Sequence, residues 1–146
     1  MPSTSLLPYQ QLLSQARAFA DSYEQIKQRF ADFADHAVEL SKQGPVPNVV
    51  IERDAKQPQF DAFYLGRRFR FELKLQANND GKVIGLVLCS EVLKEELKPV
   101  HQFTINESGN TNVIPPDSHE AIGCDSWKPA WYLLLNALHE GIKKQL

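Results

Sequence analysis

This 146-residue chain has no strong excess of positive or negative charge, no long apolar run and only two cysteines. Its 16 Lys and Arg residues are nearly balanced by 18 Asp and Glu residues, which leaves a formal net charge of −2. A dedicated nucleic-acid binder usually carries a strongly basic domain or stripe, so this balance argues against nucleic acid as a partner. No stretch approaches the ~18 consecutive apolar residues of a membrane-spanning helix, so no membrane is expected either.

Cysteine is limited to Cys89 and Cys124, which excludes a disulfide-rich scaffold. Cys89 lies in an apolar run and is predicted to be a buried, small side chain, while a bond between the two cysteines stays open. The start of the chain lacks the basic segment and apolar run of a signal peptide. These features together predict a soluble protein of the cytoplasm.

Recognisable catalytic and cofactor motifs are missing as well. The chain has no G-x-x-x-x-G-K-[ST] or G-x-G-x-x-G loop and no G-x-S-x-G elbow. His119-Glu120 does not begin an H-E-x-x-H motif, because Gly123 stands where the second histidine would be. We therefore predict no metal and no cofactor and favour a non-enzyme. A catalytic site assembled in space from histidines and Cys124 stays open.

The clearest pattern that is present is an alternation over residues 67–76. Apolar and charged side chains interleave there: Phe69, Phe71, Leu73 and Leu75 alternate with Arg68, Arg70, Glu72 and Lys74. A period of two places the apolar side chains on one face of a strand and the charged ones on the other. This alternation is typical of an antiparallel sheet with one face on a core and one in water.

Apolar residues step by three and four along residues 9–43, which predicts an amphipathic helix between Pro8 and Gly44. A continuous helix of ~34 residues would measure about 50 Å, whereas a domain of this size has a radius of gyration of ~15 Å. The helix must therefore break, overhang its own sheet or pack against something else. Asp21-Ser22 resembles a capping box and marks a possible break. An overhang would favour a homodimer through this helix.

The rest of the chain predicts a sheet followed by a second helix. Strands are expected at 48–53, 60–65, 67–76, 82–90, 101–105 and 111–114, with a hairpin turn at 78–81. Residues 91–98 suit either a helical turn or a strand edge. The fold class is therefore α+β: a long N-terminal helix at about 9–43, a five- to six-stranded, mainly antiparallel meander at about 48–114, an acidic loop at 115–125 and a helix at about 126–145. We expect a single domain with both helices on one face of the sheet.

If residues 91–98 form a short helix, the order of elements resembles that of the small secretion chaperones, which dimerise and hold an extended segment of a partner. The resemblance is topological, and it implies a protein partner and a homodimer.

Two sets of residues are candidate sites. Arg67, Arg68, Arg70 and Lys74 form a cationic strip that could bind an acidic protein surface or phosphate, or could be an ordinary solvated face. Base stacking is excluded there, because the alternation sends Phe69 and Phe71 to the opposite face. The second set could line a pocket between helices and sheet or simply fill the core: Phe19, Tyr23, Phe30, Trp127 and Trp131, with His101, His119 or Cys124 at the mouth.

The leading functional hypothesis is a non-catalytic interaction protein, such as a small adaptor, chaperone, inhibitor or immunity-type protein. It would act through a sheet or helix surface on another protein. The alternative is a small-ligand-binding or hydrolytic α+β cup that uses the aromatic pocket.

Overall fold

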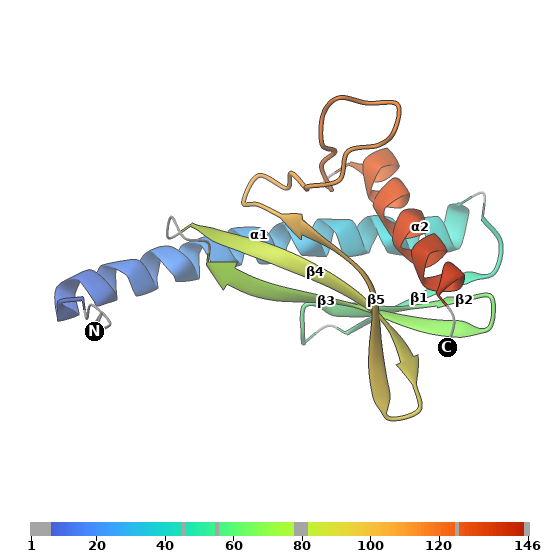
Figure 1. Ribbon diagram of the computed structural model, residues 1–146, viewed down its shortest axis with the longest axis horizontal. Coiled ribbons are helices and arrows are strands. Elements are labelled where there is room, and N and C mark those ends of the chain that lie inside the picture. Colours follow the sequence, from blue (N-terminus) through green and yellow to red (C-terminus); the bar gives the residue numbers. More distant parts are fainter. Residues whose placement is uncertain (1–6, 45, 55, 78–81, 125, 145–146) are drawn as a thin grey trace.

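A computed structural model describes residues 7–44, 46–54, 56–77, 82–124 and 126–144 (Figure 1). The α+β architecture predicted from the sequence is confirmed, with a long helix, a five-stranded antiparallel meander and a C-terminal helix. The elements are α1 (Tyr9–Gln43), β1 (Val49–Asp54), β2 (Gln59–Tyr64), β3 (Arg67–Ala77), β4 (Val83–Leu93), β5 (Glu96–Ile105) and α2 (Trp127–Lys143).

Each strand pairs with its neighbour in sequence, in the order β1-β2-β3-β4-β5. Both helices cover the same face: α1 contacts β1, β3 and β4, and α2 contacts β4, β5 and α1 (Figure 1). The opposite face is covered by no element in the described part of the chain, and we call it the open face. The strand register assigns to it Val50, Glu52, Asp61, Phe63, Arg68, Arg70, Glu72, Lys74, Ile84, Leu86, Leu88, Gln102 and Thr104.

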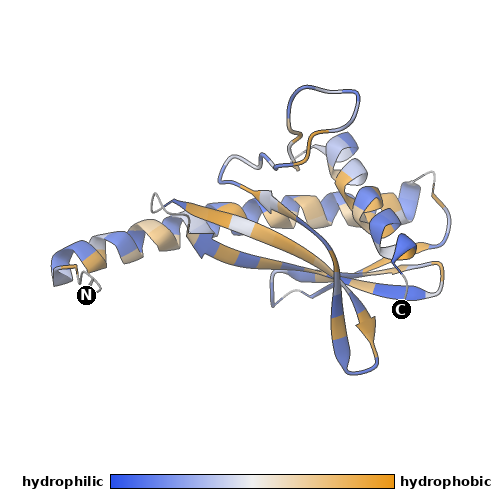
Figure 2. Cartoon of the chain, viewed as in Figure 1, coloured by the Kyte–Doolittle hydropathy of each residue, from blue (hydrophilic) through white to orange (hydrophobic). Residues whose placement is uncertain are grey.

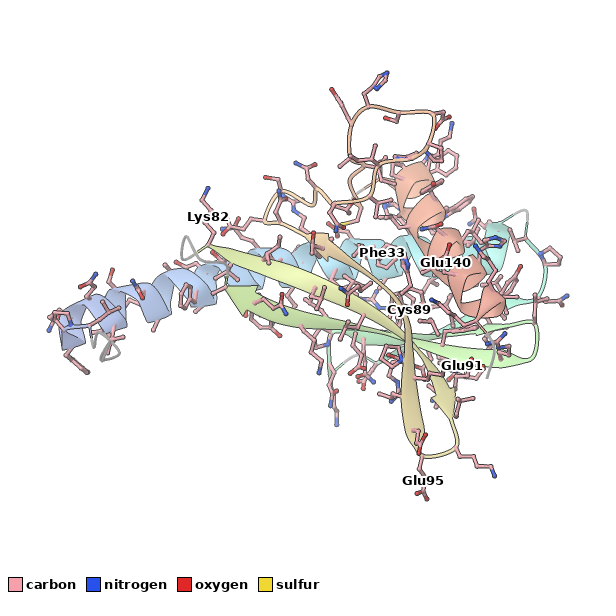
Figure 3. The ribbon with its side chains drawn as sticks, viewed as in Figure 1. Phe33, Lys82, Cys89, Glu91, Glu95 and Glu140 are labelled. Carbon is pink, nitrogen blue, oxygen red and sulfur yellow. The ribbon has the colours of Figure 1, made fainter. Side chains whose placement is uncertain are left out.

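Phenylalanine side chains form the centre of the core between α1 and the sheet. The rings of Phe60 and Phe71, which are directly paired across β2 and β3, stack at 4.7 Å between centroids. Phe33 of α1, labelled in Figure 3, packs against both rings of this stack, and its ring centroid lies 5.7 Å from that of Phe103. Aromatic pairs in such stacked and edge-on geometries add to the stabilisation from burial alone.

Helix α1 is continuous over its 35 residues, so the chain does not break at Asp21-Ser22. The Ser22 hydroxyl donates instead to the carboxylate of Glu107, which is 85 residues away in sequence. The buried residues of α1 begin only at Ile26, and the preceding turns extend past the end of the sheet (Figure 1). Of the three possibilities for this helix, the structure shows the overhang.

Residues 91–98 form the end of a β-hairpin, which confirms the strand alternative and excludes the helical turn. Val92 pairs with Leu97 and Leu93 with Glu96, and the tight turn between them places Lys94 at a φ of 53°. The cross-strand pairing outweighs a local spacing that also suits a helix. The short helix that carried the resemblance to secretion chaperones is therefore not present at this position.

The predicted sixth strand at 111–114 is replaced by a single bridge between Thr111 and Ile105. The predicted turn at 78–81 and the predicted end of the last helix at 145 lie outside the described residues. No helix in the described ranges combines the length and apolar character needed to cross a membrane.

The close contact between α2 and β3 gives the first prediction. A Cβ added at Gly141 would lie 2.5 Å from Cε1 of Phe69, whose ring is fully buried. Gly→Ala within a helix normally stabilises by about 0.5–1 kcal/mol. Here we expect Gly141→Ala to lower the free energy of unfolding by about 1–3 kcal/mol through overpacking, as measured by urea denaturation. An unchanged or higher midpoint would contradict this close packing.

Candidate functional site

The open face is divided into a charged half and an uncharged half. Strands β1 to β3 contribute its acidic and basic side chains, whereas β4 contributes the apolar row Ile84, Leu86 and Leu88. The partners of this row on β5 are Gln102 and Thr104, which carry no charge. Figure 2 shows the alternation along β3 and the more continuous apolar colour along β4. The row is half-buried by its neighbours and has no element above it in the described chain.

Asp61, Arg68 and Arg70 form the polar centre of this face, and we call them the Asp61 cluster. Asp61 and Arg70 are directly paired across β2 and β3. Nε of Arg68 donates to Oδ2 of Asp61 at 2.8 Å, and Nε of Arg70 donates to Oδ1 at 2.9 Å. Nη2 of each arginine also donates to Oδ2. These bonds use Nε and Nη2 only, so Nη1 of both guanidinium groups takes no part in them.

The electrostatics of the cluster fix its charge state. Burial opposes ionisation of Asp61, but the hydrogen bonds from Arg70 and Arg68 outweigh it and hold the pKa of this carboxyl below its usual value. Within these three residues one carboxylate therefore faces two guanidinium groups, and the one excess positive charge is partly offset by the carboxylates of Glu72 and Asp54. The Arg68 guanidinium also lies 5.3 Å from the centre of the Phe63 ring, a cation–π distance that limits its rotamers.

A hollow of about 430 Å³ borders the cluster on the side of β1. Its lining alternates in charge and includes Glu52, Asp54 and Lys56 together with the Asp61 cluster. Lys74, the last member of the predicted strip, lies further along β3, where its Nζ is 3.8 Å from a Glu72 oxygen. The hollow can hold a polar or acidic group from a partner, on the β1 side of the open face.

Arg67 does not belong to the open face, although the sequence analysis grouped it with Arg68 and Arg70. It has the same parity as Phe69 and lies on the helix-covered face. Its Nε and Nη2 donate to the two oxygens of Glu91 at 2.7 and 2.5 Å, and Glu91 is buried. Arg67 also donates to the carbonyl oxygens of Gly141 and Ile142 at 3.0 and 3.2 Å, at the C-terminal end of α2.

The Arg67–Glu91 pair therefore joins β3, β4 and α2. The hydrogen bonds from Arg67 outweigh the burial of Glu91 and lower the pKa of that carboxyl, so the pair is ionised. A cation at the C-terminal end of a helix also satisfies carbonyl groups that have no partner within the helix. Arg67 therefore links these elements on the helix-covered face instead of lining the open face.

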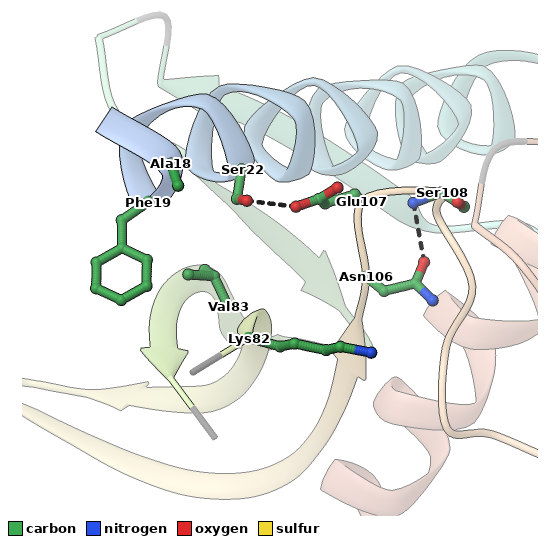
Figure 4. A pocket seen from close by; sticks show the side chains of 8 residues that line it. All are labelled: Ala18, Phe19, Ser22, Lys82, Val83, Asn106, Glu107 and Ser108. Carbon is green, nitrogen blue, oxygen red and sulfur yellow. Dashed lines mark hydrogen bonds between the residues drawn. The ribbon is translucent and has the colours of Figure 1, made fainter. Parts of the chain in front are cut away.

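The residues of the predicted aromatic pocket lie in different parts of the molecule. Phe19 lines a hollow of about 440 Å³ where α1 passes the start of β4 (Figure 4). Tyr23 and Phe30 line another, of about 260 Å³, beside Arg53. Trp127 and Trp131 contact each other at 4.9 Å between ring centres, and Nε1 of Trp131 donates to the carbonyl oxygen of His36 at 2.8 Å.

The candidates for the mouth of that pocket are also dispersed. His101 pairs with Cys89 on the helix-covered face, where burial lowers the pKa of its imidazole, and His119 is exposed on the acidic loop. Both cysteines are buried, as predicted for Cys89, and the two do not form a disulfide. Burial raises the pKa of the Cys89 thiol to about 12, so this sulfur is protonated at neutral pH. Within the described ranges, no three His, Cys, Asp or Glu side chains are grouped to hold a metal ion.

Sequence reasoning missed two residues that organise these sites, Asp61 and Glu91. Each is a single acidic residue within a strongly apolar strand, which is a signal that the sequence does contain. Strand alternation would also have placed Asp61 with Phe63 on one face. What the alternation could not supply was the register that sets Asp61 opposite Arg70.

Comparisons with known protein families, with characterised proteins and with solved structures find no significant match to this chain.

Proposed function

We propose that this chain is a non-catalytic interaction protein that binds another protein through the open face of its sheet. The observation that carries the proposal is the uncovered apolar row of β4. The row lies opposite Glu72 and Lys74 of β3, and the Asp61 cluster lies further along the same face, where Arg70 is opposite Ser90. Apolar surface next to arginine is characteristic of the centres of protein interfaces, where arginine is enriched and bulk charge is depleted. An adaptor, chaperone, inhibitor or immunity-type protein would each use such a face.

The chemistry of the open face defines the partner. Its apolar part would cover Leu86 and Leu88, and its polar part would include a carboxylate that meets the excess positive charge of the Asp61 cluster. Because Asp61 already holds the two guanidinium groups in place, the arginines lose little side-chain entropy on binding. The pairing would be charge-assisted and therefore weakened by salt.

Two matched variants test the face. We expect Leu86→Lys to abolish capture of a stoichiometric partner from the native host, because it inserts a charge into the apolar row. Leu65→Lys makes the same change at an exposed residue of the β2–β3 turn, outside the open face, and should capture the partner as the wild type does. Tagged chains are compared by affinity capture and mass spectrometry. Equal capture by all three chains, or capture of nothing, would contradict the proposal.

The ligand-binding alternative stays a prediction. Its aromatic residues do not line one common pocket, because Phe19 lines one hollow and Tyr23 and Phe30 line another. No observation favours one small molecule over another.

A further inference from the structure

The overhang of α1 continues the apolar stripe that the same helix buries in its own core. From Tyr9 the apolar positions follow at alternating intervals of three and four residues as far as Leu40. This spacing is the a and d pattern of a coiled coil. Its C-terminal part, from Ile26 onward, is buried against the sheet, whereas Tyr9 and Leu12 at the N-terminal part are 72% and 50% exposed.

We infer that the overhang pairs with the overhang of a second copy of this chain as a short antiparallel coiled coil. The overhang seam consists of Tyr9, Leu12, Ala16 and Phe19. An isolated helix of this length is marginal in water, so the turns before Ile26 gain stability if another surface covers their apolar side. This inference does not depend on the partner of the open face.

The seam is complementary to itself in the antiparallel direction. In the register that overlaps the two seams completely, Tyr9 of one copy meets Phe19 of the other, and Leu12 meets Ala16. Each layer then joins an a position with a d position, and the small Ala16 accommodates the larger Leu12. Antiparallel coiled coils are built from such mixed layers, and alternation of large and small side chains lets facing positions interdigitate.

The lack of charged residues at the positions that flank the seam favours a second copy of this chain over a different protein as the partner. The flanking positions of the overhang, which set partner choice in coiled coils, are Leu13, Gln15, Ala20 and Ser22. None of them is charged, so self-association meets no like-charge repulsion and nothing selects a foreign helix. Arg17 and Asp21 lie on the other side of the helix, four residues apart.

The position of the sheet excludes a parallel pair and allows an antiparallel one. From Ile26 onward the seam is covered by its own sheet, so a parallel partner helix would run into that sheet (Figure 1). The helix of an antiparallel partner instead begins near Phe19, at the end of the sheet. There the hollow lined by Phe19, Val83 and Glu107 is open to the end of the partner's helix, which in this register places Tyr9 beside it (Figure 4).

The first test is the mass of the purified chain by light scattering at micromolar concentration. We expect twice the 16.6 kDa of one chain for the wild type and for Gln11→Glu, and a single-chain mass for Leu12→Glu. Gln11 is the matched control, because it is the exposed neighbour of Leu12 on the side away from the seam. Circular dichroism checks that both variants are folded. A monomeric wild type, or a dimeric Leu12→Glu variant, would overturn the inference.

A second test determines the direction of the pair. Tyr9→Cys and Phe19→Cys chains are oxidised mildly, alone and as a mixture, while the native cysteines stay buried. The antiparallel pair predicts a disulfide-linked dimer in the mixture and little in either chain alone. Linked dimers from each variant alone would instead establish a parallel pair and reject this arrangement. The purified chain suffices for both tests, so their failure would leave the open-face proposal standing.

Discussion

Arg67→Met is expected to lower the free energy of unfolding by about 3–5 kcal/mol, because it removes the hydrogen-bonded partner of a buried carboxylate and leaves only the weaker attraction of Lys98. The Glu91 side chain is only 3% exposed, and Arg67 supplies both of its charge-assisted hydrogen bonds. The same substitution removes the donors to the carbonyl groups of Gly141 and Ile142. Chemical denaturation followed by circular dichroism measures the loss.

The neighbouring residue provides a matched control. Arg68 is 41% exposed and shares Asp61 with Arg70, so Arg68→Met leaves the carboxylate with a partner. We expect this variant to lose about 1 kcal/mol or less, as is usual for ion pairs near the surface. Equal losses at Arg67 and Arg68 would contradict the distinction between a structural arginine and an arginine of the open face.

A double variant separates the ion pair from the rest of the loss. Adding Glu91→Gln to Arg67→Met replaces a buried carboxylate that has lost its arginine by a neutral amide, so the double variant should be more stable than Arg67→Met alone. The interaction energy from this cycle isolates the pairwise contribution. A double variant less stable than Arg67→Met would show that the unpaired charge of Glu91 is not what costs stability.

The sequence was sufficient to predict the fold class because two periodicities in it are nearly perfect. The alternation over residues 67–76 predicted one buried face and one open face, and the steps of three and four over residues 9–43 predicted the long helix. Both are properties of local geometry and need no knowledge of the rest of the chain. The length of the helix compared with the size of the domain also anticipated the overhang.

Distant contacts decided the points that the sequence left open and the one residue that it grouped wrongly. The Asp21-Ser22 signal for a helix break was overridden by a bond from Ser22 to Glu107. The helical spacing of residues 91–98 was overridden by pairing with the returning strand. Arg67 was grouped with the open face because its charge resembles that of Arg68, although its parity places it beneath α2. Local pattern alone supplies neither the register between strands nor the position of a helix end.

Phe33→Ala and Phe19→Ala compare the same change at two positions of one helix stripe. Phe33 is fully buried and packs against Phe30, Phe60, Phe71 and Phe103. Its truncation should cost about 3–5 kcal/mol of unfolding free energy, because the surrounding rings cannot collapse into the space. Phe19 is separated from it by about four helical turns and lies at the end of the sheet, half-buried beside a hollow, so its truncation should cost the monomer about 1 kcal/mol or less.

Both substitutions are best made in the Leu12→Glu chain, where dimer formation does not contribute to the unfolding free energy. In that background, the difference in unfolding free energy between the two variants measures only the packing of the two side chains within one chain. In the chain with Leu12 intact, Phe19→Ala should in addition weaken the dimer, whereas a folded Phe33→Ala chain should still dimerise through an unaltered seam. A loss at Phe19 as large as that at Phe33 in the monomeric background would mean that the overhang already packs within one chain. The exposed seam of α1 would then not need a second copy to cover it.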